Sequence, residues 1–178
     1  IQTSRPVSWV NTAAPFAAGY LIVAGQMGPS FWIGLIYFLF PYNLLMYGVN
    51  DIYDYESDLK NPRKNSIEGA LLNKSRHKMI WYAIAVANIP FIIAMLILAP
   101  TIAAKLFFLL LVGFCFSYSM PPMRFKEIPV VDSLNSSLHF VSPLLFGLLL
   151  AGVVNIAPYL MALGAFLLWG MASQALGA

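Results

Sequence analysis

The chain has 178 residues, of which 60% are hydrophobic or aromatic and only 10% are charged, and its mean hydropathy is +0.77. A soluble domain carries about 25% charged residues, so this composition excludes an ordinary soluble protein. The formal net charge of +3 is too small to indicate a nucleic-acid partner. One cysteine, Cys115, excludes an intramolecular disulfide and a cysteine-based metal site. We therefore expect most of the chain to face lipid or other helices.

Long apolar runs define the expected elements. Each helical crossing of a bilayer needs about 20 apolar residues, and the runs are too long and too little alternating for strands. The expected fold class is all-α: a polytopic transmembrane helical bundle of about six spans, in a single domain that covers residues 1–178. In chain order, the spans are expected at residues 9–25, 31–54, 79–99, 102–118, 134–152 and 158–176.

The connections between these spans are of two kinds. Those at 25–30, 99–101 and 153–158 are short, uncharged and contain Gly or Pro, which is typical of tight turns. The two at 55–78 and 119–133 are long and charged. Nine of the ten basic residues fall on the side of the N-terminus and the long loops. The sequence therefore predicts an integral protein of the cell (plasma) membrane, with the N-terminus and both charged loops in the cytoplasm.

Four of the seven acidic residues lie within eight positions, directly after Asn50. Asn50, Asp54 and Asp58 recur every four residues, which places them on one face of a helix. Carboxylates at a membrane helix end repel one another unless a cation joins them, and hard oxygen ligands suit Mg²⁺. The cluster predicts Mg²⁺ ligation by Asn50, Asp54 and Asp58, with Asp51 beside them in a catalytic role. The alternative is the solvated start of a loop, neutralised by the basic residues that follow.

The acidic cluster is followed directly by Asn61-Pro62-Arg63-Lys64. Carboxylates that hold a metal next to guanidinium and ammonium groups suit a polyanion, most simply a diphosphate, so Arg63 and Lys64 are predicted to bind one. The stretch Tyr47 to Asp58 resembles the first aspartate-rich motif, N-D-x-x-D-x-x-x-D, of the UbiA superfamily of intramembrane prenyltransferases. Asn61-Pro62-Arg63 is similar to that family's pattern as well.

Two segments resemble most closely the lycopene elongase branch, which adds C5 units to carotenoids. They are Asp-Tyr-Glu-Ser-Asp with the following Asn-Pro-Arg-Lys, and Tyr-Ser-Met-Pro-Pro-Met-Arg-Phe-Lys-Glu at 118–127. The resemblance implies nine spans around a central cavity open to the membrane. It also implies two aspartate-rich motifs that hold Mg²⁺ and the diphosphate of an allylic donor. Only six spans are expected here, and no second D-x-x-x-D follows Asp58. The chain is therefore interpreted as the N-terminal part of such a protein, without half of the metal site.

The second charged loop closes the fourth span. Pro121-Pro122 is expected to stop the helix and to fix an extended segment that presents two cations. The resemblance implies that Tyr118, Arg124 and Lys126 help to bind the diphosphate, and the alternative for the cations is anchoring at the membrane surface. Asp132 is expected to pair with Arg124 or Lys126, or to cap the next helix.

Other polar and aromatic residues lie near the predicted site. Arg5 is expected either to anchor the N-terminus or to reach the diphosphate, and Tyr47 and Tyr53 are candidates to face a carbocation through their ring quadrupoles. Five polar residues within or beside spans are expected to point inward and to hydrogen-bond between helices, with substrate contact as the alternative: Asn11, Asn135, His139, Ser173 and Gln174.

The predicted function is Mg²⁺-dependent transfer of a prenyl group from an allylic diphosphate, dimethylallyl diphosphate, to an apolar membrane acceptor. On the elongase interpretation the acceptor is lycopene or a similar lipophilic molecule. One alternative is a UbiA-type prenyltransferase that acts on an aromatic or quinone-precursor acceptor. An alternative of another class is a membrane cation transporter, which the clustering of the acidic residues at one membrane face disfavours. Membrane lipid is the other expected partner, and nucleic acid is not.

Overall fold

The structure, a computed structural model, describes residues 1–59 and 73–177. Within these ranges the chain forms helices and connections without a strand, as the sequence predicts. The long helices are α1 (Val10–Ala24), α2 (Pro29–Leu39), α3 (Pro41–Tyr53), α5 (His77–Leu98), α6 (Ile102–Ser119), α7 (Val131–Leu150) and α8 (Leu160–Gly177). The short ones are α4 (Tyr55–Asp58) and the 3-10 helices η1 (Gln2–Ser4), η2 (Pro6–Ser8), η3 (Lys74–Arg76), η4 (Phe125–Glu127) and η5 (Ala157–Tyr159).

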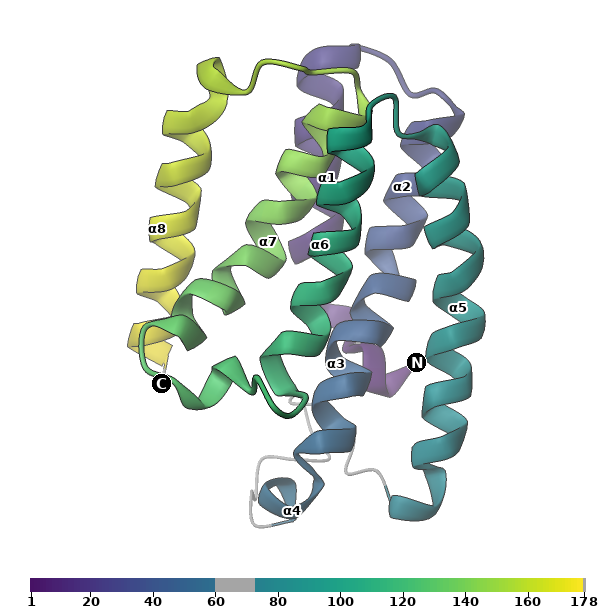
Figure 1. The fold of residues 1–178 in the computed structure, drawn as a ribbon, viewed down its shortest axis with the longest axis vertical. Helices are drawn as coiled ribbons and strands as arrows, with labels where there is room; N and C mark the ends of the chain where they lie inside the picture. The colour runs from purple at the N-terminus through teal and green to yellow at the C-terminus, as the bar shows by residue number, and fades with distance from the viewer. Residues whose placement is uncertain (60–72, 178) are drawn as a thin grey trace.

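The long helices form an up-and-down bundle in which α3 continues the course of α2 (Figure 1). Among the described residues, five helical segments are long and apolar enough to cross a membrane. The segments Gln2–Ser8 and Val10–Ala24 meet at 56° and make a sixth when they are counted as one span. Helix α7 packs against α1, α6 and α8, and α3 packs against α5, α6 and η1. The six expected spans are therefore recovered within a few residues at each end.

The predicted span 31–54 is broken into two helices at Phe40. Pro41 lacks an N–H group and begins α3, a position where proline is favoured. Side chains from neighbouring helices satisfy the backbone at the break: Thr12 donates to the Phe38 carbonyl at 2.6 Å, and Asn88 donates to the Pro41 carbonyl at 2.9 Å. Buried carbonyls need such partners because no water reaches them inside a bilayer. The break is thus part of the packed core.

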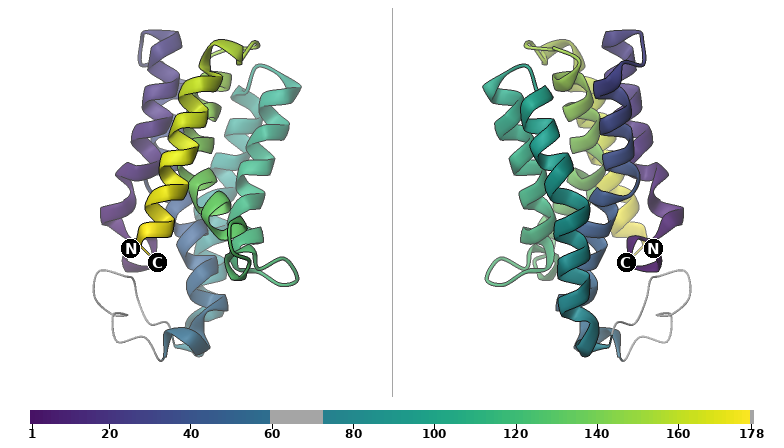
Figure 2. Two further views of the ribbon diagram at one scale, coloured as in Figure 1. Left: turned by 90° about the vertical axis from the view of Figure 1, so that its left-hand side faces the viewer. Right: turned by 90° about the vertical axis from the view of Figure 1, so that its right-hand side faces the viewer.

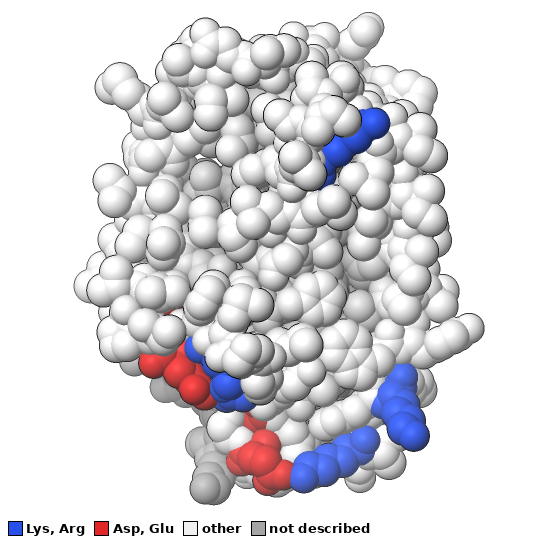
Figure 3. All heavy atoms as spheres, in the orientation of Figure 1, with Lys and Arg blue, Asp and Glu red and all other residues white. Residues whose placement is uncertain are grey.

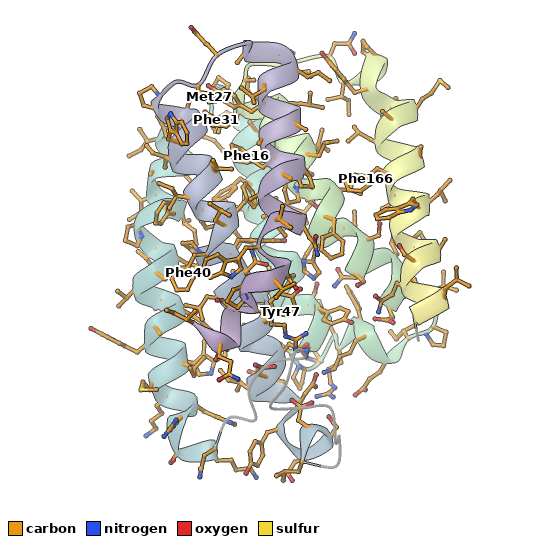
Figure 4. The ribbon with its side chains drawn as sticks, turned by 180° about the vertical axis from the view of Figure 1, so that it is seen from behind. Phe16, Met27, Phe31, Phe40, Tyr47 and Phe166 are labelled. Carbon is orange, nitrogen blue, oxygen red and sulfur yellow. The ribbon has the colours of Figure 1, made fainter. Side chains whose placement is uncertain are left out.

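Close backbone contact joins α1 to α7. A Cβ atom added at Gly19 would lie 2.1 Å from the Leu144 carbonyl oxygen, and one at Gly147 would lie 2.4 Å from that of Phe16. Small residues at such crossings let membrane helices pack through their backbones. The Phe16 ring, one of those labelled in Figure 4, is fully buried nearby. The α1–α7 contact therefore fixes the position of α7 and of the side chains that it carries.

Both termini lie toward the end of the bundle that carries α4, η3 and η4, where the two long connections begin or end (Figures 1 and 2). The charged side chains in view gather at that end, apart from one basic side chain toward the other (Figure 3). Lys105 begins the second turn of α6, which starts at the opposite end. This agrees with the predicted division between charged loops and uncharged turns. We refer below to the end with the long connections as the charged end.

Candidate functional site

A polar cavity of about 230 Å³ opens near the charged end of the bundle. Four helices, α3, α6, α7 and α8, meet around it together with Arg5 of the N-terminal segment. Its lining is Arg5, Met46, Tyr47, Asn50, Tyr118, Ser136, His139, Phe140 and Gln174. Three residues discussed as candidates for diphosphate or metal binding, Arg5, Asn50 and Tyr118, are thereby brought to one cavity from distant parts of the chain.

Arg5 is held against α3 by two contacts. Its guanidinium lies 3.3 Å from the carboxylate of Asp51, whose side chain is fully buried, and it stacks over the Tyr47 ring at 4.3 Å from the centroid. Tyr47 and Asp51 are one helical turn apart, so they present a ring and a charge to the same partner. Tyr47 lies beside the N-terminal segment in Figure 4. The N-terminus is therefore anchored on α3, with part of the Arg5 side chain left facing the cavity.

The predicted acidic stripe is not carried by one continuous helix. Helix α3 ends at Tyr53 and α4 begins at Tyr55, with Asp54 between them at φ −97° and ψ 2°. Backbone bonds from Asp54 to Asn50 (2.9 Å) and from Asp58 to Asp54 (2.8 Å) still keep the four-residue spacing. Asn50 is half-buried, and its amide oxygen has no hydrogen-bond partner within the described residues.

Asp54 joins the acidic cluster to the second charged loop. Its carboxylate forms an ion pair with Lys126 and lies 4.0 Å from the guanidinium of Arg124. Arg124 also donates through Nε to Glu127 at 2.7 Å. Removal from water lowers the pKa of the Lys126 ammonium, whereas Glu127 and Asp132 act to raise it. Two cations and a carboxylate from segments about seventy positions apart thus share one patch at the charged end.

One expectation for this loop is wrong. The segment after α6 turns at residues 121–123 and continues into η4, so Pro121-Pro122 does not fix an extended segment. Among the described residues, the ion-pair partners of Arg124 and Lys126 are Asp54 and Glu127, not Asp132. Asp132 instead lies in the first turn of α7, where its charge interacts favourably with the helix dipole, and the N-cap residue is Val130.

Tyr118 and His139 form the inner wall of the polar cavity. Their rings meet edge to face at 5.8 Å between centroids. His139 is 97% buried, and its Nδ1 lies 3.1 Å from the hydroxyl of Tyr42, which ties α7 to α3. Its Nε2 is buried and has no hydrogen-bond partner among the described residues. The expected helix-to-helix bond of His139 is confirmed, and one ring nitrogen is left over.

A second, more apolar cavity of about 460 Å³ adjoins the first between α1, α7 and α8. Phe140 and Gln174 line both cavities. Phe166 points from α8 toward the neighbouring helices in Figure 4. The lining is Val10, Asn11, Ala14, Pro15, Phe140, Phe166, Trp169, Gly170, Ser173 and Gln174. A polar cavity at the charged end therefore lies beside a space suited to an apolar chain.

The donor atoms at the end of α3 are of the type that binds Mg²⁺. Carboxylate and amide oxygens are hard ligands, and Mg²⁺ is usually held by one or two carboxylates with water and substrate phosphate at its other positions. Asp54, Asp58 and the unpartnered amide oxygen of Asn50 supply such a set. In the described ranges, no group of three or more His, Cys, Asp or Glu side chains converges as a metal site. The chemistry of these donor atoms suits a metal whose other positions are filled by water or phosphate.

Comparison with known proteins identifies the family of this chain. The model of the UbiA prenyltransferase family matches residues 12–176. The chain belongs to the UbiA prenyltransferase family. The family resemblance read from the aspartate-rich motif is thereby confirmed.

The curated UbiA relatives are longer than this chain. A lycopene elongase/hydratase of Corynebacterium glutamicum is 49% identical over 178 residues, which is 100% of this chain and 62% of that protein. A C(50) beta-cyclic carotenoids biosynthesis protein, LbtBC, of Dietzia sp. is 49% identical over 99% of this chain and 40% of its own length. A lycopene elongase/hydratase of Halobacterium salinarum is 33% identical over 94% of the chain and 60% of that protein. The chain thus spans about three fifths or less of these relatives.

A solved structure has the same fold. It is a UbiA homologue of Archaeoglobus fulgidus bound to DMAPP and Mg²⁺, with a TM-score of 0.70 at 22% identity. The match covers 91% of this chain and 58% of that one. The helical bundle described above is therefore part of a UbiA fold.

Sequence reasoning located only part of this UbiA cavity. Arg63 and Lys64 lie outside the described residues, so their predicted role stays a prediction. Tyr47 lines the cavity, whereas Tyr53 packs edge to face against Trp81 at 6.4 Å. The other predicted span residues divide as follows: Asn135 bonds to the Phe114 carbonyl of α6, Ser173 bonds within α8, and Asn11, Ser173 and Gln174 line the apolar cavity.

Ser136 was missed by sequence reasoning altogether. It and His139 are three residues apart in α7, so both face the cavity. That spacing of polar residues within an apolar span is the signal that identifies this face of α7.

Proposed function

We propose that the protein containing this chain transfers a prenyl group from an allylic diphosphate to an apolar carotenoid acceptor, with dimethylallyl diphosphate and lycopene as the substrates. The observation that carries the proposal is the pair of adjoining cavities. The polar one holds a cation, an amide oxygen and a phenol near the acidic cluster, and the apolar one leads away between α1, α7 and α8. Family membership and the names of the relatives support this reaction class.

The charged end supplies the groups that a diphosphate needs. Arg5 and Tyr118 line the polar cavity, and Arg124 and Lys126 lie with Asp54 at the charged end. Charge-assisted hydrogen bonds from such groups would hold the diphosphate equally before and during the break of its bond to carbon. Asn50, Asp54 and Asp58 would hold Mg²⁺, which neutralises phosphate charge when bound. Arg63 and Lys64 remain predicted contacts from the first loop.

The apolar walls protect the reactive carbon. An allylic cation reacts with water unless water is excluded, and a cavity lined largely by apolar side chains excludes it. The rings of Tyr47 and Tyr118 face the polar cavity and can stabilise the cation through their quadrupoles. The acceptor's terminal double bond would then attack from the side of the apolar cavity. An acceptor as insoluble as lycopene reaches such a site from lipid.

The membrane arrangement follows from the same division of charges. We propose that the protein is integral to the plasma membrane, with the N-terminus and the charged end in the cytoplasm, where a water-soluble diphosphate is supplied. Among the described residues, the acidic side chains gather at the charged end, which disfavours a cation pathway through the bundle. The single domain predicted for residues 1–178 is proposed to be the first part of the prenyltransferase domain.

A direct assay tests the proposal. Membranes containing the full-length protein receive Mg²⁺, labelled dimethylallyl diphosphate and either lycopene or an aromatic acid acceptor. We expect label in a longer carotenoid, and loss of transfer when Mg²⁺ is chelated. Transfer to the aromatic acceptor alone would overturn the acceptor assignment and keep the reaction class. Absence of transfer to either acceptor would overturn the proposed function.

A further inference from the structure

His139 has a ring nitrogen that the proposed reaction has not yet used. The side chain is 97% buried and lines the polar cavity, yet its Nε2 lacks a hydrogen-bond partner among the described residues. A buried polar atom left without a partner costs about 1–3 kcal/mol, so such an atom calls for a cause. The His139 ring lies against that of Tyr118, and both residues line the polar cavity.

The other ring nitrogen is fixed in a way that leaves Nε2 basic. Nδ1 lies 3.1 Å from the Tyr42 hydroxyl, so an N–H at Nδ1 can donate to the Tyr42 oxygen. In this arrangement the imidazole carries its hydrogen on Nδ1 and presents a lone pair at Nε2. The partner of one nitrogen thus sets the tautomer of the ring.

We propose that His139 is the base that takes up the proton released when the prenylated carbocation is quenched. The proposal rests on the proposed function, because it assigns a residue to the last step of that reaction. Attack by the acceptor's double bond uses its π pair to form the new C–C bond and leaves a positive charge on the tertiary carbon. The pair of an adjacent C–H bond then forms a C=C bond, and the proton passes to the Nε2 lone pair. If water adds instead, its oxygen bonds to the cation and Nε2 takes one water proton.

The location of His139 suits this task better than that of the carboxylates. Asp54 is engaged by cations of the second loop, and Asp51 is paired with Arg5. A neutral imidazole with a lone pair facing a cavity can act as a general base, and a positioned general base typically contributes about 10²–10⁴-fold to a rate. Phe140, the next residue on α7, lines both cavities. The base therefore lies at the junction where the bound donor and the acceptor's reacting end would meet.

The experiment uses variants that separate the role of Nδ1 from the role of Nε2. His139→Asn keeps an amide that can bond to Tyr42 but removes Nε2, and Tyr42→Phe removes the bond but keeps Nε2. Ser142→Ala is the matched control, since Ser142 is buried one turn further along α7 and bonds within its own helix. Each full-length variant is assayed in membranes for carotenoid formation, diphosphate release and donor KM, and in detergent for thermal stability.

We expect His139→Asn to lower kcat by about 10²-fold, with donor KM within twofold and a product mixture that contains prenyl alcohol or other misquenched products. Tyr42→Phe is expected to lower kcat less, and Ser142→Ala to match the parent. Parent-like turnover and products in His139→Asn would overturn the assignment, as would equal losses of kcat and stability in His139→Asn and Tyr42→Phe. If the parent transfers no label at all, the proposed function fails and this inference falls with it. Transfer that is insensitive to His139→Asn overturns the inference alone.

Discussion

The two ends of the bundle are built from the same helices but differ in what connects them. At the uncharged end, the turns after α1, α5 and α7 are short. At the charged end, the connections are long, and the ends of helices, the N-terminal segment and η4 bring opposite charges together. The same described helices therefore support both ends of the bundle, but the charged groups that could take part in chemistry lie at the charged end. The placement of the charges therefore marks the site.

Replacing an aspartate at the charged end should have the largest effect. Asp54→Asn is expected to lower prenyl transfer in the full-length protein by roughly 10²–10³-fold, because a carboxylate that holds Mg²⁺ contributes several kcal/mol to stabilising transition-state charge. Transfer of labelled prenyl groups in membranes measures this. The matched control is Glu56→Gln, an exposed acidic residue two positions away whose partner is Lys74. Similar rates for the two variants would remove Asp54 from the site.

Removing a cation from the second loop should have an intermediate effect. Lys126→Gln is expected to raise donor KM about tenfold, since one charge-assisted bond to a diphosphate is worth roughly 1.5–3 kcal/mol. Lys126→Arg should restore most of the affinity. The readout is KM against kcat for dimethylallyl diphosphate, because loss of uniform binding raises KM and leaves kcat unchanged. A fall in kcat at constant KM would indicate that Lys126 acts only by holding Asp54 in place.

The spans were predictable from the sequence, but the meeting of distant side chains was not. Apolar runs of about 20 residues are a local property, so each span was located within a few residues. The break at Phe40 had a local signal in Pro41 and was still missed, because the apolar run continues on both sides of it. Span prediction therefore fails first where a helix is interrupted inside an apolar stretch.

The candidate site depends on packing that no local pattern encodes. The acidic motif identified Asn50, Asp54 and Asp58 as candidates, yet the pairing of Asp54 with Lys126 joins segments far apart in the chain. Asp132 was the nearer partner in sequence, and helix α7 instead carries it in its first turn. His139 was predicted to hydrogen-bond between helices, and only the cavity revealed its second nitrogen. Sequence patterns therefore indicate the chemistry of a site, but not which of its residues contact one another.

Changes in the scaffold should affect stability more than catalysis. Gly19→Ala is expected to destabilise the protein by about 1–3 kcal/mol, because its Cβ would meet the Leu144 carbonyl at 2.1 Å and the two backbones must separate. Gly113→Ala is the matched control in α6, where nothing lies within 4 Å of the added atom. Thermal unfolding in detergent compares the two. Equal stability of both variants would show that the α1–α7 backbone contact is looser than described.

The smallest effect on activity is expected from cysteine substitutions that report which side of the membrane each end of the bundle faces. In a Cys115→Ser background, Lys105→Cys lies near the uncharged end and Lys74→Cys at the charged end. A membrane-impermeant maleimide added to intact cells should label position 105 and leave position 74 unlabelled until the membrane is opened. Both variants should keep activity within about twofold, because surface charges and exposed ion pairs such as Lys74–Glu56 contribute little. Labelling of position 74 from outside would reverse the proposed orientation. It would also place the diphosphate site on the face away from the cytoplasm, where a soluble prenyl donor is not supplied.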